Sequence, residues 1–230
     1  MISGVILAGG SGRRMGGNTP KQFLTLDGKP LIWYSLRAFS ESEVDEIILV
    51  TREEDIDYCR KKIVEKYGFT KVKKIVAGGS ERYLSVENGL HAADETSERV
   101  IIHDGARPLV TPEIISRVLQ DAMKYGAATA AMPVKDTIKI ADPDGFGRET
   151  PDRSSVYQIQ TPQAFSRAIL VEAFLKRRAL DDRNITDDTM LVERYTGVPT
   201  KMTQGSYENI KVTTPEDLPV AELFLSRQRV

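Results

Sequence analysis

The sequence predicts a single α/β domain, residues 1–230, built on a doubly wound and mostly parallel sheet with a Rossmann-like fold. Short apolar runs at 5–7, 46–51 and 72–77 are typical of strands buried on both faces, and they alternate with charged stretches that have helical spacing. The chain has 230 residues, 40% hydrophobic and 28% charged. This length and composition predict one large globular domain.

Charge and cysteine usage exclude several classes of protein. The formal net charge of −1 argues against a broad nucleic-acid footprint, so any bound phosphate should belong to a small molecule. The one cysteine, Cys59, lies in a charged helical pattern and is interpreted as structural. No basic leader opens the chain and no stretch has the apolar length of a membrane span. We therefore expect a cytoplasmic protein without a membrane or nucleic-acid partner.

The stretch from Leu7 to Lys21 predicts a phosphate-binding loop at the carboxyl end of the first strand. Its glycines let main-chain N–H groups approach an anion, and Arg13, Arg14 and Lys21 can donate charge-assisted hydrogen bonds. The glycine spacing is one residue longer than the dinucleotide fingerprint, and no P-loop lysine motif follows. The alternative is an ordinary glycine-rich turn whose arginines are merely solvated.

The elements expected after this loop complete the α/β pattern. The first is a helix from Pro30, with Leu31, Ile32, Leu36 and Phe39 on its buried side. In the rest of the first half we expect strands at 46–51, 72–77 and 99–103. They alternate with an amphipathic helix at 53–67, a helix from Tyr83 and a helix capped at 111–113. In the second half they are a strand at 127–132, helices at 166–180 and 187–195, an edge strand at 200–202, a strand at 208–212 and a last helix from 215–217.

Residues from about 135 to 158 predict a protruding β-arm within the domain. The segment 133–140 alternates like an exposed ribbon, 142–145 is a turn, and 154–160 can return to pair with the outgoing segment. Such an arm buries little by itself, which suggests that it packs on another subunit.

Three strands are followed by loops of special chemistry: the loop after Leu7, Gly78-Gly79-Ser80-Glu81-Arg82, and His103-Asp104-Gly105-Ala106-Arg107-Pro108. The carboxyl ends of parallel strands meet along one edge of a sheet. The glycines can admit a nucleotide, the basic side chains can neutralise its phosphates, and Asp104 can hold Mg²⁺ or order the reactants.

These residues carry a resemblance. Leu7 to Met15 with Pro20-Lys21-Gln22-Phe23 resembles the signature of the sugar-nucleotide-transferase-like cytidylyltransferases. The loops above, with Ser85-Val86, Asp136-Thr137, Thr161-Pro162-Gln163, Thr186-Asp187 and Asn209-Ile210-Lys211-Val212-Thr213, resemble the 2-C-methyl-D-erythritol 4-phosphate cytidylyltransferase family of the non-mevalonate isoprenoid pathway. The match runs through nearly the whole chain in order, and it implies a nucleotidyltransferase fold.

The resemblance implies transfer of CMP from CTP to a polyol phosphate, with Mg²⁺ bound mainly to the triphosphate. The catalytic residues it implies are Arg14 and Lys21 at the triphosphate, with Arg153 and Lys211 positioning the acceptor phosphate. For the nucleotide side it implies Ala8, Gly9, Gly10, Ser11, Gly12, Gly79, Ser80, Ser85, Asp104 and Ala106, with Asp104 as a tentative metal ligand. For the acceptor it implies Arg107, Thr137, Thr186, Arg153 and Lys211. Because Thr137 and Arg153 lie in the arm, it also implies a homodimer with arm exchange.

Other interpretations remain open on the sequence. D-ribitol-5-phosphate cytidylyltransferase shares the glycine loop and the segment 160–163, and a nucleotide-sensing module could keep the fold without catalysis. Arg82 is interpreted as a helix cap or ion-pair partner, and His103 as a packed strand-end residue. Lys211 could be an ordinary solvent-facing lysine, but the family motif favours a functional role.

Overall fold

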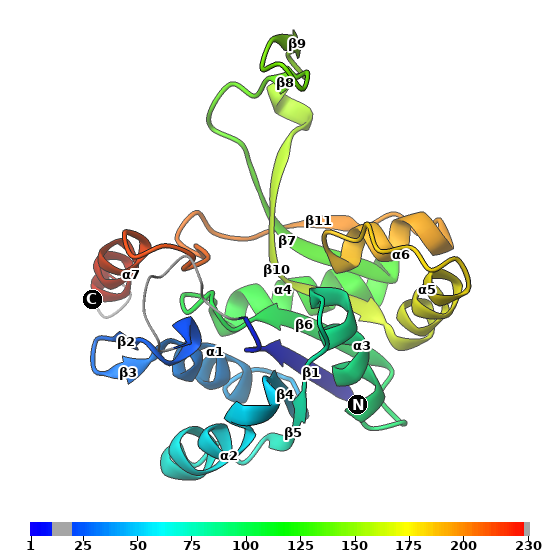
Figure 1. Cartoon of the computed structure of the whole chain (residues 1–230). Helices are drawn as coiled ribbons and strands as arrows, with labels where there is room; N and C mark the ends of the chain where they lie inside the picture. The colour runs from blue at the N-terminus through cyan, green and yellow to red at the C-terminus, as the bar shows by residue number, and fades with distance from the viewer. Residues whose placement is uncertain (11–19, 228–230) are drawn as a thin grey trace.

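The structure, a computed structural model, describes residues 1–10 and 20–227. The strands of its main sheet are β1 (Ile2–Leu7), β4 (Glu46–Thr51), β5 (Val72–Ala77), β6 (Arg99–Asp104), β7 (Ala127–Pro133), β10 (Tyr157–Ser166) and β11 (Lys201–Gln204). They lie in the order β11-β7-β10-β6-β1-β4-β5 (Figure 1). Only β10 runs antiparallel to its neighbours in this sheet. The predicted mostly parallel sheet is confirmed.

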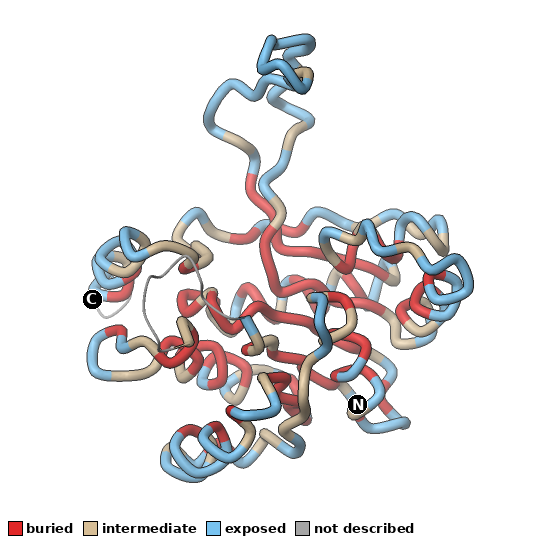
Figure 2. Tube along the Cα trace, in the orientation of Figure 1, coloured by how far each residue is buried: buried red, intermediate tan, exposed pale blue. Residues whose placement is uncertain are grey.

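Helices cover both faces of this sheet. They are α1 (Leu31–Ser40), α2 (Ile56–Tyr58), α3 (Arg82–Ala92), α4 (Pro112–Tyr125), α5 (Arg167–Ala179), α6 (Asp188–Thr196) and α7 (Asp217–Arg227). Adjacent strand residues point to opposite faces. Ile6 therefore packs in the apolar cluster under α1 and α4, while Val5 packs in the cluster under α3, α5 and α6. Figure 2 shows the buried sheet between these helices.

The boundaries of α4 follow from local chemistry that the sequence signals. The Thr111 side chain accepts a hydrogen bond from the Ile114 N–H at 3.4 Å, and Pro112 occupies the first turn. Gly126 ends the helix with φ of 88°, a backbone conformation that favours glycine.

One predicted helix differs in detail, and one small hairpin was not predicted. The expected helix at 53–67 consists of a 3-10 turn, Glu53–Asp55, the short α2 and a π-helical segment, Cys59–Glu65. Its apolar side is nevertheless as expected, because Cys59 and Ile63 are fully buried. A small hairpin that the sequence did not predict, β2 (Thr25–Leu26) with β3 (Lys29–Pro30), precedes α1.

The predicted strand at 208–212 is wrong. Backbone bonds inside the segment, from Ile210 N–H to Glu208 O at 2.7 Å and from Asn209 N–H to Ser206 O at 3.1 Å, form turns instead of a ladder. Ile210 and Val212 pack in a third apolar cluster that includes Leu225 of α7. The segment crosses the edge of the sheet, because the Val212 N–H donates to Ala106 O at 2.8 Å.

Residues between β7 and β10 stand away from the sheet (Figure 1). The returning chain pairs with the end of β7, where Tyr157 faces Pro133, and beyond it the Val134 N–H donates to Val156 O at 3.1 Å. Near the tip, β8 (Ile140–Ala141) pairs with β9 (Gly147–Glu149). The alternating pattern at 133–140 therefore does not produce a continuous two-stranded ribbon. Within one chain, the side chains of this segment have no apolar surface of the protein to pack against.

A glycine sets how closely α3 approaches the sheet, and we predict that Gly89→Val destabilises the protein. A Cβ at Gly89 would lie 2.4 Å from Val5 Cγ1, in the buried interface between α3 and β1. We expect a loss of about 1–3 kcal/mol in the free energy of unfolding, the usual cost of overpacking a core. Denaturant unfolding measures it, with His91→Val on the exposed side of the same helix as the control. Equal stability of the two variants would contradict this packing.

Candidate active site

The carboxyl ends of four parallel strands lie side by side and bring three loops together. The Gly105 N–H donates to Leu7 O at 2.9 Å, which joins the loop after β6 to the end of β1. The Ala8 N–H donates to Val50 O at 2.6 Å, and the Gly78 N–H donates to Thr51 O at 2.7 Å. These bonds connect the loops after β1 and β5 through β4. The predicted convergence of the three loops is therefore present.

A cavity of about 460 Å³ opens between these loops. It is lined by Leu7, Gly9, Gly10, Lys21, Gly79, Ser80, Glu81, Arg82, Ser85, Asp104, Ala106 and Lys211. Most of the residues assigned to the nucleotide thus share one cavity, although Ala8 is buried and does not line it. Ser11, Gly12, Arg13 and Arg14 lie outside the described residues.

A second cavity of about 450 Å³ continues from the first. The two share Arg82, Asp104 and Lys211 in their walls. Arg107 and Thr186, both assigned to the acceptor, line the second cavity together with residues of β10 and α6. The first cavity therefore offers the glycine loops, and the second offers three cationic side chains and three threonine hydroxyls.

Ser85 organises the loop after β5. Its Oγ accepts a hydrogen bond from the Gly79 N–H at 3.1 Å and donates to Glu81 O at 3.2 Å. A Cβ at Gly79 would lie 2.4 Å from Leu84 Cβ, so the backbone can fold this tightly only with glycine there. The loop presents Ser80 as an exposed side chain at the wall of the first cavity.

Asp104 is held by two cations where the cavities meet. Its Oδ1 lies 3.2 Å from Arg82 Nε and its Oδ2 lies 2.7 Å from Lys211 Nζ. Burial by itself would raise the pKa of this carboxyl, but Arg82 and Lys211 hold it well below its usual range. Asp104 is therefore an anion whose two oxygens are fixed in direction.

Arg82 makes a second ion pair that the sequence did not reveal. Its Nη2 lies 2.9 Å from Oδ2 of Asp188, whose side chain is fully buried at the start of α6. Arg82 is an ion-pair residue, but its partners lie at the end of β6 and the start of α6, and not on the helix that follows it as interpreted. Asp188 was missed because it is 106 residues away. Its position directly after the Thr186-Asp187 motif was the available signal.

Lys21 and Lys211 are brought to the same place by the segment that crosses the sheet edge. Lys21 Nζ donates to Val212 O at 3.1 Å, next to the lysine that binds Asp104. Asn209 anchors this segment with two hydrogen bonds. Its side-chain amide donates to Thr161 O at 2.9 Å, and its backbone carbonyl accepts from Arg107 Nη1 at 2.8 Å. Lys211 is therefore an anchored part of the site.

His103 is a packed residue, as expected. It is fully buried, its ring lies against Phe39, and its two ring nitrogens bond Arg107 O at 3.1 Å and Thr161 Oγ1 at 3.0 Å. Burial lowers the pKa of His103 to about 4. The ring is therefore neutral near pH 7 and occupied by structural bonds.

Thr137 and Arg153 are not brought to this site within one chain. Both are exposed on the arm, and neither lines the two cavities. Arg153 Nη1 donates to Lys135 O at 3.2 Å, which ties together the two sides of the arm.

The described residues do not fit a metal ion held by the protein. None of their His, Cys, Asp and Glu side chains form a group of three that could hold one. Both Asp104 oxygens already bind cations, which disfavours the tentative role of Asp104 as a direct ligand.

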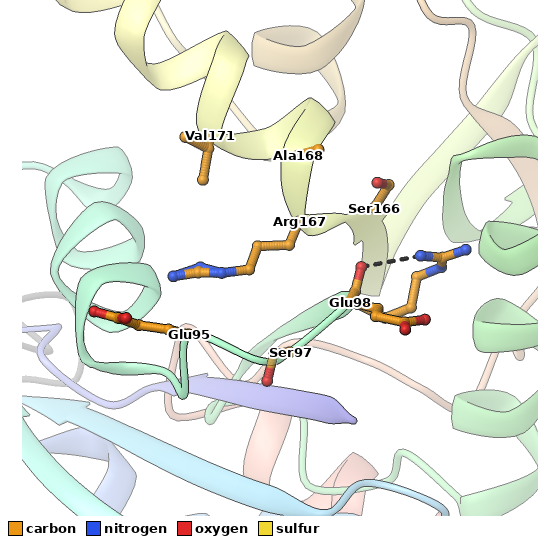
Figure 3. Close-up of a pocket in the computed structure, with 8 residues that line it drawn as sticks. Glu95, Ser97, Glu98, Ser166, Arg167, Ala168 and Val171 are labelled. Atoms are coloured by element: carbon orange, nitrogen blue, oxygen red, sulfur yellow. Dashed lines mark hydrogen bonds between the residues drawn. The ribbon is translucent and has the colours of Figure 1, made fainter.

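A larger cavity of about 660 Å³ lies away from these loops, at the starts of β6 and α5 (Figure 3). Its wall includes Ser97, Glu98, Ser166 and Arg167, and it contains none of the predicted site residues. Size alone does not identify the site, since the chemistry lies at the carboxyl edge of the sheet. No helix in the described ranges has the length and apolarity to cross a membrane.

Comparisons with known proteins agree with this geometry. Residues 2–227 match the family model of 2-C-methyl-D-erythritol 4-phosphate cytidylyltransferase. Curated members from Caldanaerobacter subterraneus subsp. tengcongensis and Lachnospira eligens are 49% and 48% identical, each over 98% of this chain and 99% of the relative. The crystal structure of 4-diphosphocytidyl-2C-methyl-D-erythritol synthase from Anaerococcus prevotii has a TM-score of 0.85 and 37% identity, and the match covers 98% of this chain and 96% of that one. The chain belongs to the 2-C-methyl-D-erythritol 4-phosphate cytidylyltransferase family.

Proposed function

We propose that this enzyme transfers CMP from CTP to the phosphate of 2-C-methyl-D-erythritol 4-phosphate, giving 4-diphosphocytidyl-2-C-methyl-D-erythritol and pyrophosphate. The observation that supports this most is the junction of two cavities at Arg82, Asp104 and Lys211. CTP occupies the cavity with the glycine loops, and the polyol phosphate occupies the cavity with Arg107 and Thr186. The two reactants then face each other across Lys211.

The reaction needs positioning and charge stabilisation more than a base. An oxygen of the acceptor phosphate is already a nucleophile; it attacks the α-phosphorus of CTP, and the bond to the β-phosphate oxygen breaks. Negative charge grows on the transferred phosphoryl and on the leaving pyrophosphate. Arg14 and Lys21 stabilise that charge, while Lys211 and Arg153 hold the acceptor phosphate in line.

The nucleotide is held by backbone and small side chains. Gly9, Gly10, Ser11 and Gly12 lie beneath the triphosphate, and Gly79, Ser80 and Ser85 contact the cytosine. Asp104 and Ala106 border the ribose. Mg²⁺ bound to CTP would neutralise part of the triphosphate charge.

The arm completes the site of a second subunit in a homodimer. Thr137 and Arg153 are exposed on the arm and line neither cavity of their own chain. An arm that stands away from the sheet can insert between the loops of a partner (Figure 1). Exposed apolar side chains near its tip, Ile140 and Phe146, supply surface for that contact.

The acceptor is tested by a paired assay of pyrophosphate release from CTP. We expect release with 2-C-methyl-D-erythritol 4-phosphate and little with D-ribitol 5-phosphate, because the acceptor must fill the second cavity. The opposite preference would overturn the proposed substrate and favour D-ribitol-5-phosphate cytidylyltransferase activity.

Loss of either triphosphate cation should slow turnover. We expect Arg14→Ala and Lys21→Ala to lower kcat by about 10²- to 10³-fold, the usual effect of removing a transition-state donor. Lys61→Ala, an exposed lysine outside both cavities, is the control. Near-normal turnover in both loop variants would contradict their roles. If the wild-type protein shows no turnover and Lys21→Ala changes only CTP binding, the nucleotide-sensing alternative is favoured.

Mixed dimers test whether the arm acts in the partner's site. Lys21→Ala and Arg153→Ala subunits are each impaired, but random exchange should give mixed dimers in which one composite site is intact, or about one site in four overall. Pyrophosphate release should therefore rise on mixing, whereas mixing two Lys21→Ala preparations should change nothing. If subunit exchange is demonstrated by mass spectrometry without recovery, Arg153 belongs to the site of its own subunit.

A further inference from the structure

Four charged side chains form a continuous line from the core to the junction of the cavities. Asp188 Oδ2 lies 2.9 Å from Arg82 Nη2, Arg82 Nε lies 3.2 Å from Asp104 Oδ1, and Asp104 Oδ2 lies 2.7 Å from Lys211 Nζ. The members come from α6, α3, the end of β6 and the segment that crosses the sheet edge. Two carboxylates thus alternate with two cations.

Asp188 is the one member that does not reach the substrates. Its side chain is fully buried, and it lines neither cavity, although its neighbours Asp187 and Thr189 line the second. The start of α6 gives its charge partial support from the helix dipole. Oδ1 of Asp188 makes no hydrogen bond within the described chain, so Arg82 is the residue that compensates this buried carboxylate.

The charge on Asp188 changes how strongly the Asp104 carboxylate can hold the Lys211 ammonium. Arg82 divides its charge between Asp188 and Asp104 in the observed geometry. With Asp188 neutral, the whole guanidinium charge would act on Asp104 and would oppose the Lys211 ammonium at close range. Burial raises the pKa of Asp188, while the ion pair with Arg82 stabilises its charged form. Charge held at Asp188 therefore favours the Asp104–Lys211 contact without touching either group.

We propose that Asp188 is a positioning residue for the transfer reaction, acting through Arg82 and Asp104 to hold Lys211 where it meets the acceptor phosphate. This inference rests on the proposed function for the role of Lys211, but the ion-pair relay itself can be tested without turnover. The substitution Asp188→Asn tests it, because it keeps the shape and a hydrogen-bond acceptor for Arg82 and removes only the charge.

The first measurement is the acylation rate of Lys211 by acetic anhydride in the ligand-free protein, followed by mass spectrometry with Lys61 as the internal reference. We expect Lys211 to react several-fold faster in Asp188→Asn than in wild type, because its ion pair is weakened. Unchanged acylation of Lys211 in Asp188→Asn would overturn the relay.

The second measurement is turnover. We expect Asp188→Asn to lower kcat by about 10- to 100-fold while the Kd for CTP changes little, as misplacement of one positioning group does. Because Asp188 acts through Arg82, adding Asp188→Asn to Arg82→Gln should cause no further loss. Independent, multiplying losses in the double variant would overturn the proposed route.

A matched control separates positioning from general stability. Glu87 on α3 is also a buried carboxylate paired with arginines, at 2.6 Å from Arg178 and 3.6 Å from Arg177, and it lines neither cavity. Glu87→Gln should reduce the stability of the protein without changing kcat or the acylation rate of Lys211. If Glu87→Gln and Asp188→Asn change kcat and Lys211 acylation equally, a positioning role for Asp188 is contradicted. If wild-type protein shows no transfer at all, the proposed function fails, and the acylation rates still decide the relay.

Discussion

The ion pair between Asp104 and Lys211 is the constraint on which the rest of the site depends. Asp104 ends β6 at the centre of the sheet, and Lys211 comes from a segment more than a hundred residues later in the chain. The contact exists because Asn209 and Val212 fix the later segment against Thr161, Arg107 and Ala106. The pair in turn joins the nucleotide cavity to the acceptor cavity, because both residues are in the walls of each.

Close backbone approach makes this junction possible. The loop after β6 lies against the end of β1, and a Cβ at Gly105 would be 2.5 Å from Ile32 Cδ1 and 3.0 Å from Leu7 O. From sequence alone, alanine at this position looks like a neutral exchange. In this chain the exchange would require Ile32, which is fully buried, to shift. The packing behind the loop therefore favours glycine at position 105.

The polar residues behind the site are used for structure more than for chemistry. His103 and Asn209 are buried and hydrogen-bonded, and they connect β6, β10 and the segment that carries Lys211. Both ring nitrogens of His103 are hydrogen-bonded, and the Asn209 side-chain amide donates to Gln160 and Thr161. Burial lowers the pKa of His103, so this histidine next to the candidate site is neutral and structural.

The sequence alone determined the strands, the helices around them and the convergence of three loops, because those features depend on local periodicity and on the parallel arrangement of strands. It also predicted Lys21, Asp104 and Lys211 as site residues, and the structure places all three in the wall of one cavity. Only the tertiary structure showed that 208–212 is not a strand, since an alternating apolar pattern also suits a segment that packs Ile210 and Val212 under α7. Likewise, Asp188 carries no local signal of its role. Its importance comes from an ion pair with Arg82 across 106 residues, and such pairing is decided by how the helices pack, which no short stretch of sequence encodes.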